Sequence, residues 1–348
     1  TEIYAEWSKS THARAWLDDA QFQAELAKST TPESDVGWMC VNCHTPTEGQ
    51  LPRLVVGLKG GRLDAPEYVV NPAFDPAFQL EAIGCATCHV ADGVILGPWG
   101  DSKAPHPVRR SEALLGVEVC TSCHQAKAEF PSINLACTFD TGAEFAASPQ
   151  ARDGKTCPAC HMPEVVRPAA LGAEPRTTRR HWFGGSLIPK AARFEADMAA
   201  MREHYPDGLA LAWAELPSPT PGQELRVALE YRNAEAGHLL PTGDPERFLR
   251  IEAWAVGADG VELARAAVRI GTVYEWWPQV KKLEDNRLKP GEGRRLELVF
   301  AAPDGPVTLH FEASKWRISE ENLAFHHLEG QVVPGRIFAS GEVVLGGG

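Results

Sequence analysis

Four copies of one pentapeptide constrain this chain more than any other feature of its sequence. Two thiols at CxxC spacing can each add to one vinyl group of a single porphyrin, and a histidine directly after them then faces the iron. The repeat therefore predicts four covalently attached c-type haems. The four copies hold eight of the nine cysteines, and they are CVNCH (Cys40–His44), CATCH (Cys85–His89), CTSCH (Cys120–His124) and CPACH (Cys157–His161).

Two other chemistries use CxxC pairs. Paired CxxC units can form four-cysteine zinc sites, and a single CxxC can act as a redox dithiol. A zinc ribbon needs no histidine at the same offset in every copy, and a dithiol enzyme needs no fourth copy. We therefore interpret His44, His89, His124 and His161 as proximal iron ligands, and the attachment residues as Cys40, Cys43, Cys85, Cys88, Cys120, Cys123, Cys157 and Cys160.

The positions of the motifs and the apolar–polar patterns predict an α+β multidomain protein. All four motifs lie in residues 1–185, which predict a tetrahaem cytochrome c domain of short helices and loops packed on the porphyrins. Within it, residues 2–28 have helical spacing. Residues 186–206 predict a linking helix. Residues 207–348 alternate apolar and polar side chains between Pro and Gly turns, which predicts an antiparallel, immunoglobulin-like β-sandwich.

Function depends on the second axial ligand of each iron, and histidine is the expected source. Met39 and Met162 flank motifs too closely to reach the far face of the same haem. We predict four distal ligands: His12 in the first helix, His106 between two prolines, His181 in RRHWFGG, and His238 in the stiff loop AEAGHLLPTGDPERF. His238 would then reach a haem across the domain boundary. The alternative for each is an ordinary surface or structural histidine, the role expected of His204, His310, His326 and His327.

Two further features concern the haem surroundings. Basic runs place Arg109 and Arg110 near His106, and Arg179 and Arg180 near His181, where guanidinium groups could pair with haem propionates or line a solvated face. The ninth cysteine, Cys137, is interpreted as a small buried thiol. Thiolate ligation of a haem and a disulfide to another subunit are its alternatives.

Charge and hydropathy limit the partners and the compartment. The formal net charge of −12 disfavours binding to nucleic acid or to an anionic membrane surface. No apolar run approaches the roughly 18 residues that a membrane span needs. Haem attachment through thioethers predicts an exported, periplasmic protein whose signal peptide is absent from this chain.

Three stretches carry a resemblance to a known family. The segments EWSKSTHARAW, GKTCPACHMP and GHLLPTGDPERF resemble the periplasmic multihaem c-type cytochromes grouped around the tetrahaem electron acceptor of hydroxylamine oxidoreductase. Members of that family are mostly electron carriers, some are subunits of larger redox complexes, and a few have a reactive haem. The resemblance also implies that His12, in the first segment, is a distal ligand.

The expected function is electron transfer between a redox donor and a redox acceptor protein through mostly bis-histidine haems. We favour this carrier over a catalytic oxidoreductase. Two alternatives remain open. One is a haem enzyme in which an open or gated iron acts on a small nitrogen or sulfur compound. The other is a cytochrome subunit that its β domain docks to a larger redox complex.

Overall fold

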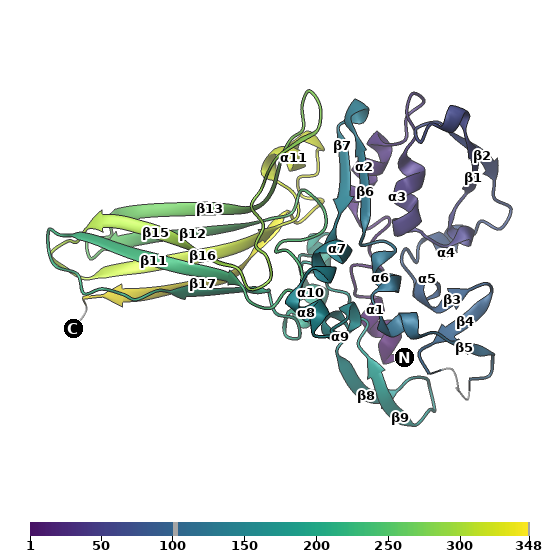
Figure 1. The fold of residues 1–348 in the computed structure, drawn as a ribbon, viewed down its shortest axis with the longest axis horizontal. Helices are drawn as coiled ribbons and strands as arrows, with labels where there is room; N and C mark the ends of the chain where they lie inside the picture. The colour runs from purple at the N-terminus through teal and green to yellow at the C-terminus, as the bar shows by residue number, and fades with distance from the viewer. Residues whose placement is uncertain (100–103, 347–348) are drawn as a thin grey trace.

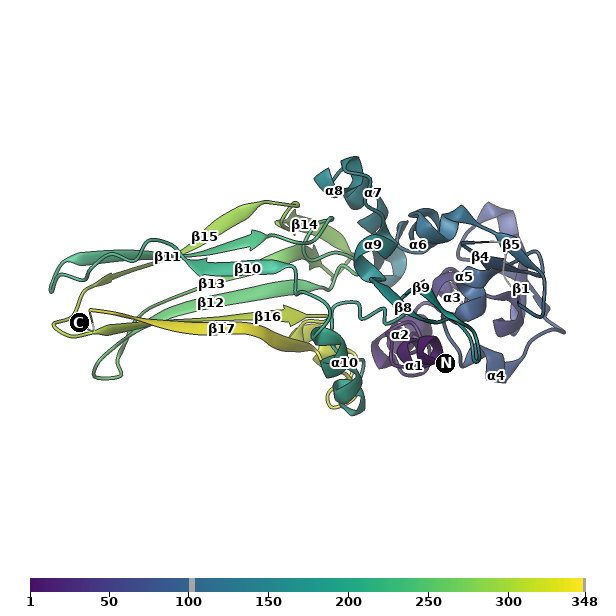
Figure 2. The same cartoon turned by 90° about the horizontal axis from the view of Figure 1, so that it is seen from below.

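The computed structural model describes residues 1–99 and 104–346, and it places the CxxCH motifs and the long strands at opposite ends of an elongated molecule (Figure 1, Figure 2). Its helices are α1 (Glu2–Trp7), α2 (Ala20–Lys28), α3 (Gly37–His44), α4 (Pro76–Gln79), α5 (Cys85–His89), α6 (Glu118–Thr121), α7 (Thr141–Ala146), α8 (Pro149–Arg152), α9 (Cys157–His161), α10 (Glu195–Arg202) and α11 (Glu320–Phe325). In the described part of the chain, no helix combines the length and apolarity that crossing a bilayer requires.

The motif-bearing end contains only short strands among these helices. Their pairing is antiparallel except between β4 and β5, which run parallel. The strands are β1 (Arg53–Leu58) with β2 (Pro66–Val70), β3 (Val90–Ala91) with β4 (Val94–Gly97) and β5 (Val108–Arg110), β6 (Ala126–Phe130) with β7 (Leu135–Phe139), and β8 (Glu164–Pro168) with β9 (Pro175–Arg179).

The other end is built from long antiparallel strands in two sheets. One sheet has the order β10-β11-β15 and the other the order β14-β13-β12-β16-β17. Burial alternates along β11 and β12, as expected for strands with one face on a core. The strands are β10 (Leu209–Trp213), β11 (Glu224–Asn233), β12 (Phe248–Gly257), β13 (Glu262–Glu275), β14 (Lys281–Asp285), β15 (Gly293–Ala301), β16 (Val307–Trp316) and β17 (Gly335–Leu345).

The largest apolar core lies between these two sheets. Leu229 and Leu298 from the first sheet pack in one cluster with Ile251 and Leu309 from the second. The motif-bearing end has only a small cluster of its own around Leu187, Met198 and Met201. This difference fits the expectation that porphyrins supply much of the apolar surface at that end.

The expected single helix over residues 2–28 is interrupted. Helix α1 ends at Trp7, turns follow, and α2 begins after Asp19, whose carboxylate accepts a hydrogen bond from the Phe22 N–H and so caps it. In the turns, Ser10 Oγ accepts a hydrogen bond from Ala13 N–H, at 3.2 Å. Serine and threonine side chains compete for backbone partners in this way and so favour turns over helix. His12 therefore lies in a turn.

The two ends of the molecule meet through α2 and the segment that follows β16. Ile318, Leu328 and Val332 form an apolar cluster on which Ala20 and Ala24 of α2 pack. Polar contacts extend the same junction, because His326 pairs with Glu25 at 2.9 Å. The junction is therefore partly apolar and partly ionic.

Candidate haem sites

Each CxxCH motif forms a short helical turn. The motifs lie in α3, α5 and α9, and the third continues from α6 through a hydrogen bond from His124 N–H to the Cys120 carbonyl oxygen, at 2.9 Å. Residues three apart on a helix share a face, so the two thiols of each motif project together. None of the nine cysteines, all of which lie within the described residues, forms a disulfide. No group of three or more His, Cys, Asp or Glu side chains within residues 1–99 and 104–346 is arranged to hold a bare metal ion.

Three of the four motif histidines each face a second histidine, and the separation of the two rings is nearly the same in all three pairs. The ring centroids are 6.4 Å apart for His12 and His124, 6.3 Å for His89 and His181, and 6.3 Å for His161 and His238. An imidazole nitrogen lies about 2.0 Å from a bound transition metal and roughly 1.1–1.2 Å from its own ring centroid, so two trans imidazoles have centroids about 6.3 Å apart. The three spacings fit a haem iron between the rings.

Hydrogen bonds orient several of these imidazoles. Nδ1–H donates to a backbone carbonyl oxygen in His44 (Ala15, 2.7 Å), His89 (Leu96, 3.0 Å), His181 (Arg179, 2.9 Å) and His238 (Leu239, 2.8 Å). Such a bond fixes the tautomer and leaves Nε2 for a metal.

Desolvation by the surrounding protein atoms favours the neutral form of these imidazoles, of which none is fully buried and two, His124 and His161, are exposed. It lowers the pKa of His12 to about 3 and the pKa of both His44 and His161 to about 4. It also lowers the pKa of His124, His181 and His238. Neutral imidazole is the form that binds iron, so these sites need no deprotonation at physiological pH.

The segment after β9 positions two of the distal histidines. Thr11 donates from its backbone N–H and from Oγ1 to the Phe183 carbonyl oxygen, at 3.2 and 2.6 Å, and the Phe183 ring stacks on His12 with centroids 4.5 Å apart. Two residues earlier, His181 N–H donates to the carboxylate of Glu6 at 3.0 Å. One short segment therefore fixes both His12 and His181.

His238 lies in a loop of the β end that docks on α7 and α8. The Asn233 side chain donates to the His238 carbonyl oxygen at 2.9 Å. Gly237 approaches so closely that a Cβ there would lie 3.2 Å from Phe145 and 3.3 Å from Gln150. Thr242 adds a hydrogen bond to the Glu144 carboxylate at 2.6 Å. These contacts hold His238 opposite His161.

The loop is pinned by residues that sequence reasoning did not select. Arg287 pairs with Glu144 at 2.7 Å, and both side chains are largely buried. Glu246 of the same loop does not contribute to this connection, because its carboxylate accepts hydrogen bonds from Ser319 N–H and the Asn322 side chain, within the β end itself. No sequence motif marked Glu144 or Arg287.

His44 has different surroundings. Phe22 stacks on it with ring centroids 3.5 Å apart, and within residues 1–99 and 104–346 no second imidazole lies opposite it at the spacing of the other pairs. His106, predicted as a distal ligand, is exposed, and its Nδ1–H points to the Pro107 carbonyl oxygen at 3.3 Å. The structure thus does not bring His106 to any motif histidine.

The four attachment sites are grouped around the third motif. Cys43 lies beside Cys123, and Cys120 lies beside Cys157. Cys123 is also near Cys88. The first, second and fourth motifs therefore each lie beside a cysteine of the third.

The four predicted propionate-binding arginines all have protein partners. Arg109 pairs with Asp92 at 3.2 Å, Arg110 with Glu112 at 2.9 Å, and Arg179 with Glu164 at 3.1 Å. Arg180 pairs with Glu6, which also binds the buried Arg167, a residue that sequence reasoning missed. Propionate contacts of these arginines stay a prediction.

Cys137 lies in β7 close to the first attachment site. Burial raises the pKa of its thiol, and the charges of Asp244, Cys40 and Glu25 raise it further. A thiol with a raised pKa resists forming the thiolate that would bind iron or react. The side chain itself is half-buried rather than fully buried.

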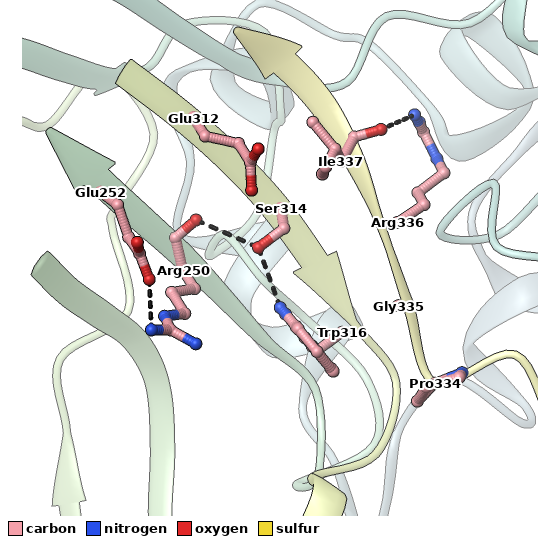
Figure 3. A pocket seen from close by; sticks show the side chains of 9 residues that line it. All are labelled: Arg250, Glu252, Glu312, Ser314, Trp316, Pro334, Gly335, Arg336 and Ile337. Atoms are coloured by element: carbon pink, nitrogen blue, oxygen red, sulfur yellow. Dashed lines mark hydrogen bonds and ion pairs between the residues drawn. The ribbon is translucent and has the colours of Figure 1, made fainter. Parts of the chain in front are cut away.

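A shallow pocket on the β end is remote from the motifs. Its floor includes Trp316, whose Nε1–H donates to Ser314 Oγ at 2.9 Å, and Arg250, which pairs with Glu252 (Figure 3). Glu312 also lines the pocket, and its carboxylate makes no hydrogen bond or ion pair within residues 1–99 and 104–346.

Comparisons with known proteins agree with the motifs. A model of the family described as cytochrome c554 and c-prime matches residues 1–60. A penta-haem cytochrome c552 from Thermochromatium tepidum has a TM-score of 0.66 at 17% sequence identity, covering 99% of this chain and 96% of that chain. A match to a β-glucuronidase from Bacteroides uniformis covers 41% of this chain and 13% of the β-glucuronidase chain at 12% identity. Its TM-score of 0.20 is too low to indicate a shared overall fold. No curated protein matches the sequence. The family match and the shared fold support the assignment of this chain as a multihaem c-type cytochrome.

Proposed function

We propose that this chain is a periplasmic tetrahaem cytochrome c that passes electrons between a donor and an acceptor protein. Its haem domain spans residues 1–185, residues 186–206 link it to the rest, and residues 207–348 form an immunoglobulin-like β-sandwich that is available for docking to a larger complex. The observation that carries this proposal is the set of three imidazole pairs with centroids 6.3–6.4 Å apart. An iron held between two histidines has no free position for a substrate, which suits electron transfer.

The paired histidines would determine the coordination of each haem iron. Covalently bound haem supplies one-electron chemistry at each attachment site. The pairs His12/His124, His89/His181 and His161/His238 would hold the irons six-coordinate. Backbone carbonyl groups orient the rings, and desolvation by the surrounding protein favours uncharged imidazoles. Ligands held in this way would limit the rearrangement that accompanies each electron.

The grouping of the attachment sites suggests where partners bind. Cys85 of the second motif and Cys160 of the fourth are exposed, whereas the cysteines of the first and third motifs are half-buried. The edges of the second and fourth haems are therefore the expected points of exchange with partner proteins. The third site lies between them and the first.

Four attachment sites imply a measurable haem content. The intact protein is expected to exceed the polypeptide mass by four haem groups, and to stay coloured after denaturation because thioether bonds survive unfolding. Mass spectrometry of the denatured protein checks this. A colourless product containing zinc would contradict the assignment, and a variant with both Cys157 and Cys160 replaced by alanine should lose one haem.

A second function is favoured by one observation at the first motif. His44 has a phenylalanine stacked on it and no imidazole opposite it among the described residues, so its iron would keep one face without a histidine ligand. We propose as the alternative that a small nitrogen or sulfur compound reacts at this site. The other three sites would then supply or remove its electrons.

This alternative predicts that the resting protein binds an external ligand at one iron of four. Titration with cyanide, nitric oxide or hydroxylamine, followed by optical and electron paramagnetic resonance spectra, should reveal one high-spin iron that becomes low-spin. Turnover of hydroxylamine would favour the enzyme. Complete inertness of all four irons would leave the electron carrier as the function and would mean that a residue other than histidine occupies the first site.

A further inference from the structure

Arg317 has one buried nitrogen without a hydrogen-bond partner. The residue directly follows β16 and is 7% exposed. Its Nε–H donates to Gln21 Oε1 at 3.0 Å, and its Nη2 donates to Asp19 Oδ1 at 2.7 Å. Nη1 is also buried, and it makes no hydrogen bond to any of residues 1–99 and 104–346. A buried donor without an acceptor is unfavourable, and more so when the group carries a charge.

The acceptors that this guanidinium contacts are already in use. Asp19 Oδ1 accepts hydrogen bonds from Arg317 Nη2 and from Phe22 N–H, at 2.7 and 3.5 Å, and Asp19 Oδ2 accepts one from Lys190. Gln21 Oε1 accepts the bond from Nε–H. Nε–H and one Nη2–H share an edge of the planar guanidinium, so Nη1 is directed away from the edge that these oxygens occupy. Nη1 therefore needs an acceptor other than Asp19 or Gln21.

The same cluster has an excess of positive charge. The side chains of Arg317 and Lys190 are 8% and 17% exposed. In the part of the chain that the structure describes, Asp19 is the one carboxylate within ion-pair distance of either cation. Two cations therefore share a single carboxylate, which leaves one positive charge in excess. Because charge removed from water is costly unless it is paired, a further anion would stabilise this cluster.

Contacts between side chains place the cluster beside the first CxxCH motif. Asp19 caps α2 by accepting the Phe22 N–H, and the Phe22 ring stacks on His44 with centroids 3.5 Å apart. His44 Nδ1–H donates to the Ala15 carbonyl oxygen at 2.7 Å, in the turns just ahead of Asp19. Arg317 is thus connected to His44 through the first turn of α2. A haem attached at this motif would lie next to the cluster.

We propose that Arg317 Nη1 donates to an anionic oxygen ligand at the first haem site. Guanidinium N–H groups form strong, charge-assisted hydrogen bonds to carboxylates and to small oxyanions. Two sources share that chemistry: a propionate of the first haem, or a free oxyanion that approaches the first iron. The inference rests on the proposed haem content, and it adds a binding residue that no sequence motif indicated.

The test compares Arg317→Gln and Arg317→Lys with the parent, in the full haem-loaded protein. Arg193→Gln is the matched control, since Arg193 is 63% exposed and pairs with Asp18, the residue before Asp19. Haems with isotopically labelled propionate carboxyl groups are followed by redox-difference infrared spectroscopy, and potentials by spectroelectrochemical titration. Sulfite and nitrite are titrated as oxyanion probes, with carbon monoxide as an uncharged ligand.

If the ligand is a propionate, the labelled carboxylate band of one propionate shifts in both Arg317 variants, because neither side chain can place a nitrogen at both Nη positions. Arg317→Gln also disfavours reduction of one haem about tenfold, a fall of about 59 mV for one electron, because a positive charge beside the haem is lost. Sulfite and nitrite then leave the parent spectrum unchanged.

If the ligand is a free oxyanion, the labelled bands of both variants match those of the parent. The parent then binds sulfite or nitrite, and both variants weaken that binding about tenfold or more without altering the binding of carbon monoxide. Arg193→Gln should match the parent in every measurement.

The inference is overturned if neither the labelled bands nor the anion titrations of the two Arg317 variants differ from those of the parent, the result expected if ordered water satisfies Nη1. A change in potential alone also overturns it, because loss of a charge acts on a haem without contact. A failure of the proposed function is distinct, since the parent would lack four haems. Should Arg317→Gln fail to load haem, Arg317→Lys, which keeps the charge on Asp19, decides between the outcomes.

Discussion

Replacing His238 by alanine is expected to convert one low-spin haem into a high-spin haem that binds cyanide. His238 faces His161 with ring centroids 6.3 Å apart and an interplanar angle of 11°, so its removal opens one face of the fourth iron. If the first iron is already open, the number of ligand-accessible irons rises from one to two per chain. Electron paramagnetic resonance of the resting protein and a cyanide titration measure this directly.

Two further variants make that result interpretable. His181→Ala should open the second iron in the same way, because His181 and His89 have the same 6.3 Å spacing. His106→Ala should leave all spectra unchanged, since His106 is exposed and makes no ring contact with a motif histidine among the described residues. If His106→Ala creates a high-spin iron and His238→Ala does not, the distal ligands have been assigned to the wrong histidines.

Asp19→Asn is expected to destabilise the protein by about 3–5 kcal/mol at neutral pH, the loss typical of removing one partner from a buried ion pair. Asp19 is 3% exposed and pairs with Arg317 at 2.7 Å and with Lys190. The variant leaves two cations without their shared carboxylate at the junction between α2 and the β end. Urea unfolding followed by circular dichroism measures the change.

The contribution of Asp19 to the free energy of unfolding should decrease as the pH falls. Burial alone would raise the pKa of Asp19, but the charges and hydrogen bonds of Lys190 and Arg317 outweigh it and hold the pKa well below its ordinary value. A carboxyl group with a lowered folded pKa stabilises the protein above its unfolded pKa of about 3.9. The stabilisation is lost as the pH falls from there toward the folded pKa. The difference between parent and Asp19→Asn should therefore narrow in acid.

Asp18→Asn provides the neighbouring control. Asp18 pairs with Arg14 at 3.1 Å and with Arg193 at 2.7 Å, but all three side chains are partly or largely exposed. Exposed pairs contribute only about 0–1 kcal/mol. Equal losses in the two variants would show that burial of the Asp19 cluster does not govern its contribution.

The sequence was most informative where chemistry depends on spacing within a few residues. The CxxCH motifs predict the attachment sites, and the alternation of apolar and polar residues predicted antiparallel strands in residues 207–348, where β10 to β17 are found. It was less informative over residues 2–28, where apolar spacing suggested one helix. Serine and threonine side chains bind the backbone there, so the helix breaks into turns around His12.

Contacts between side chains that lie far apart in the sequence could not be predicted from local sequence patterns. His106 and His238 both lie in proline-containing loops, yet only His238 faces a motif histidine, because Gly237 and Thr242 dock its loop on α7 and α8. The paired charges Asp19, Lys190 and Arg317 come from distant segments that no motif connects. Their roles follow only from which side chains the fold brings together.

The position of His238 also constrains how the protein matures. Thioether bonds depend only on residues within each motif, so all four haems can be attached to a chain that has not yet folded. On the proposed assignment, however, the fourth iron would acquire its second imidazole from a loop that lies between β11 and β12 and is held by Asn233 of β11. A newly exported chain would therefore pass through a stage in which this iron is open, and closure of the β end onto α7 would complete assembly by ending its reactivity.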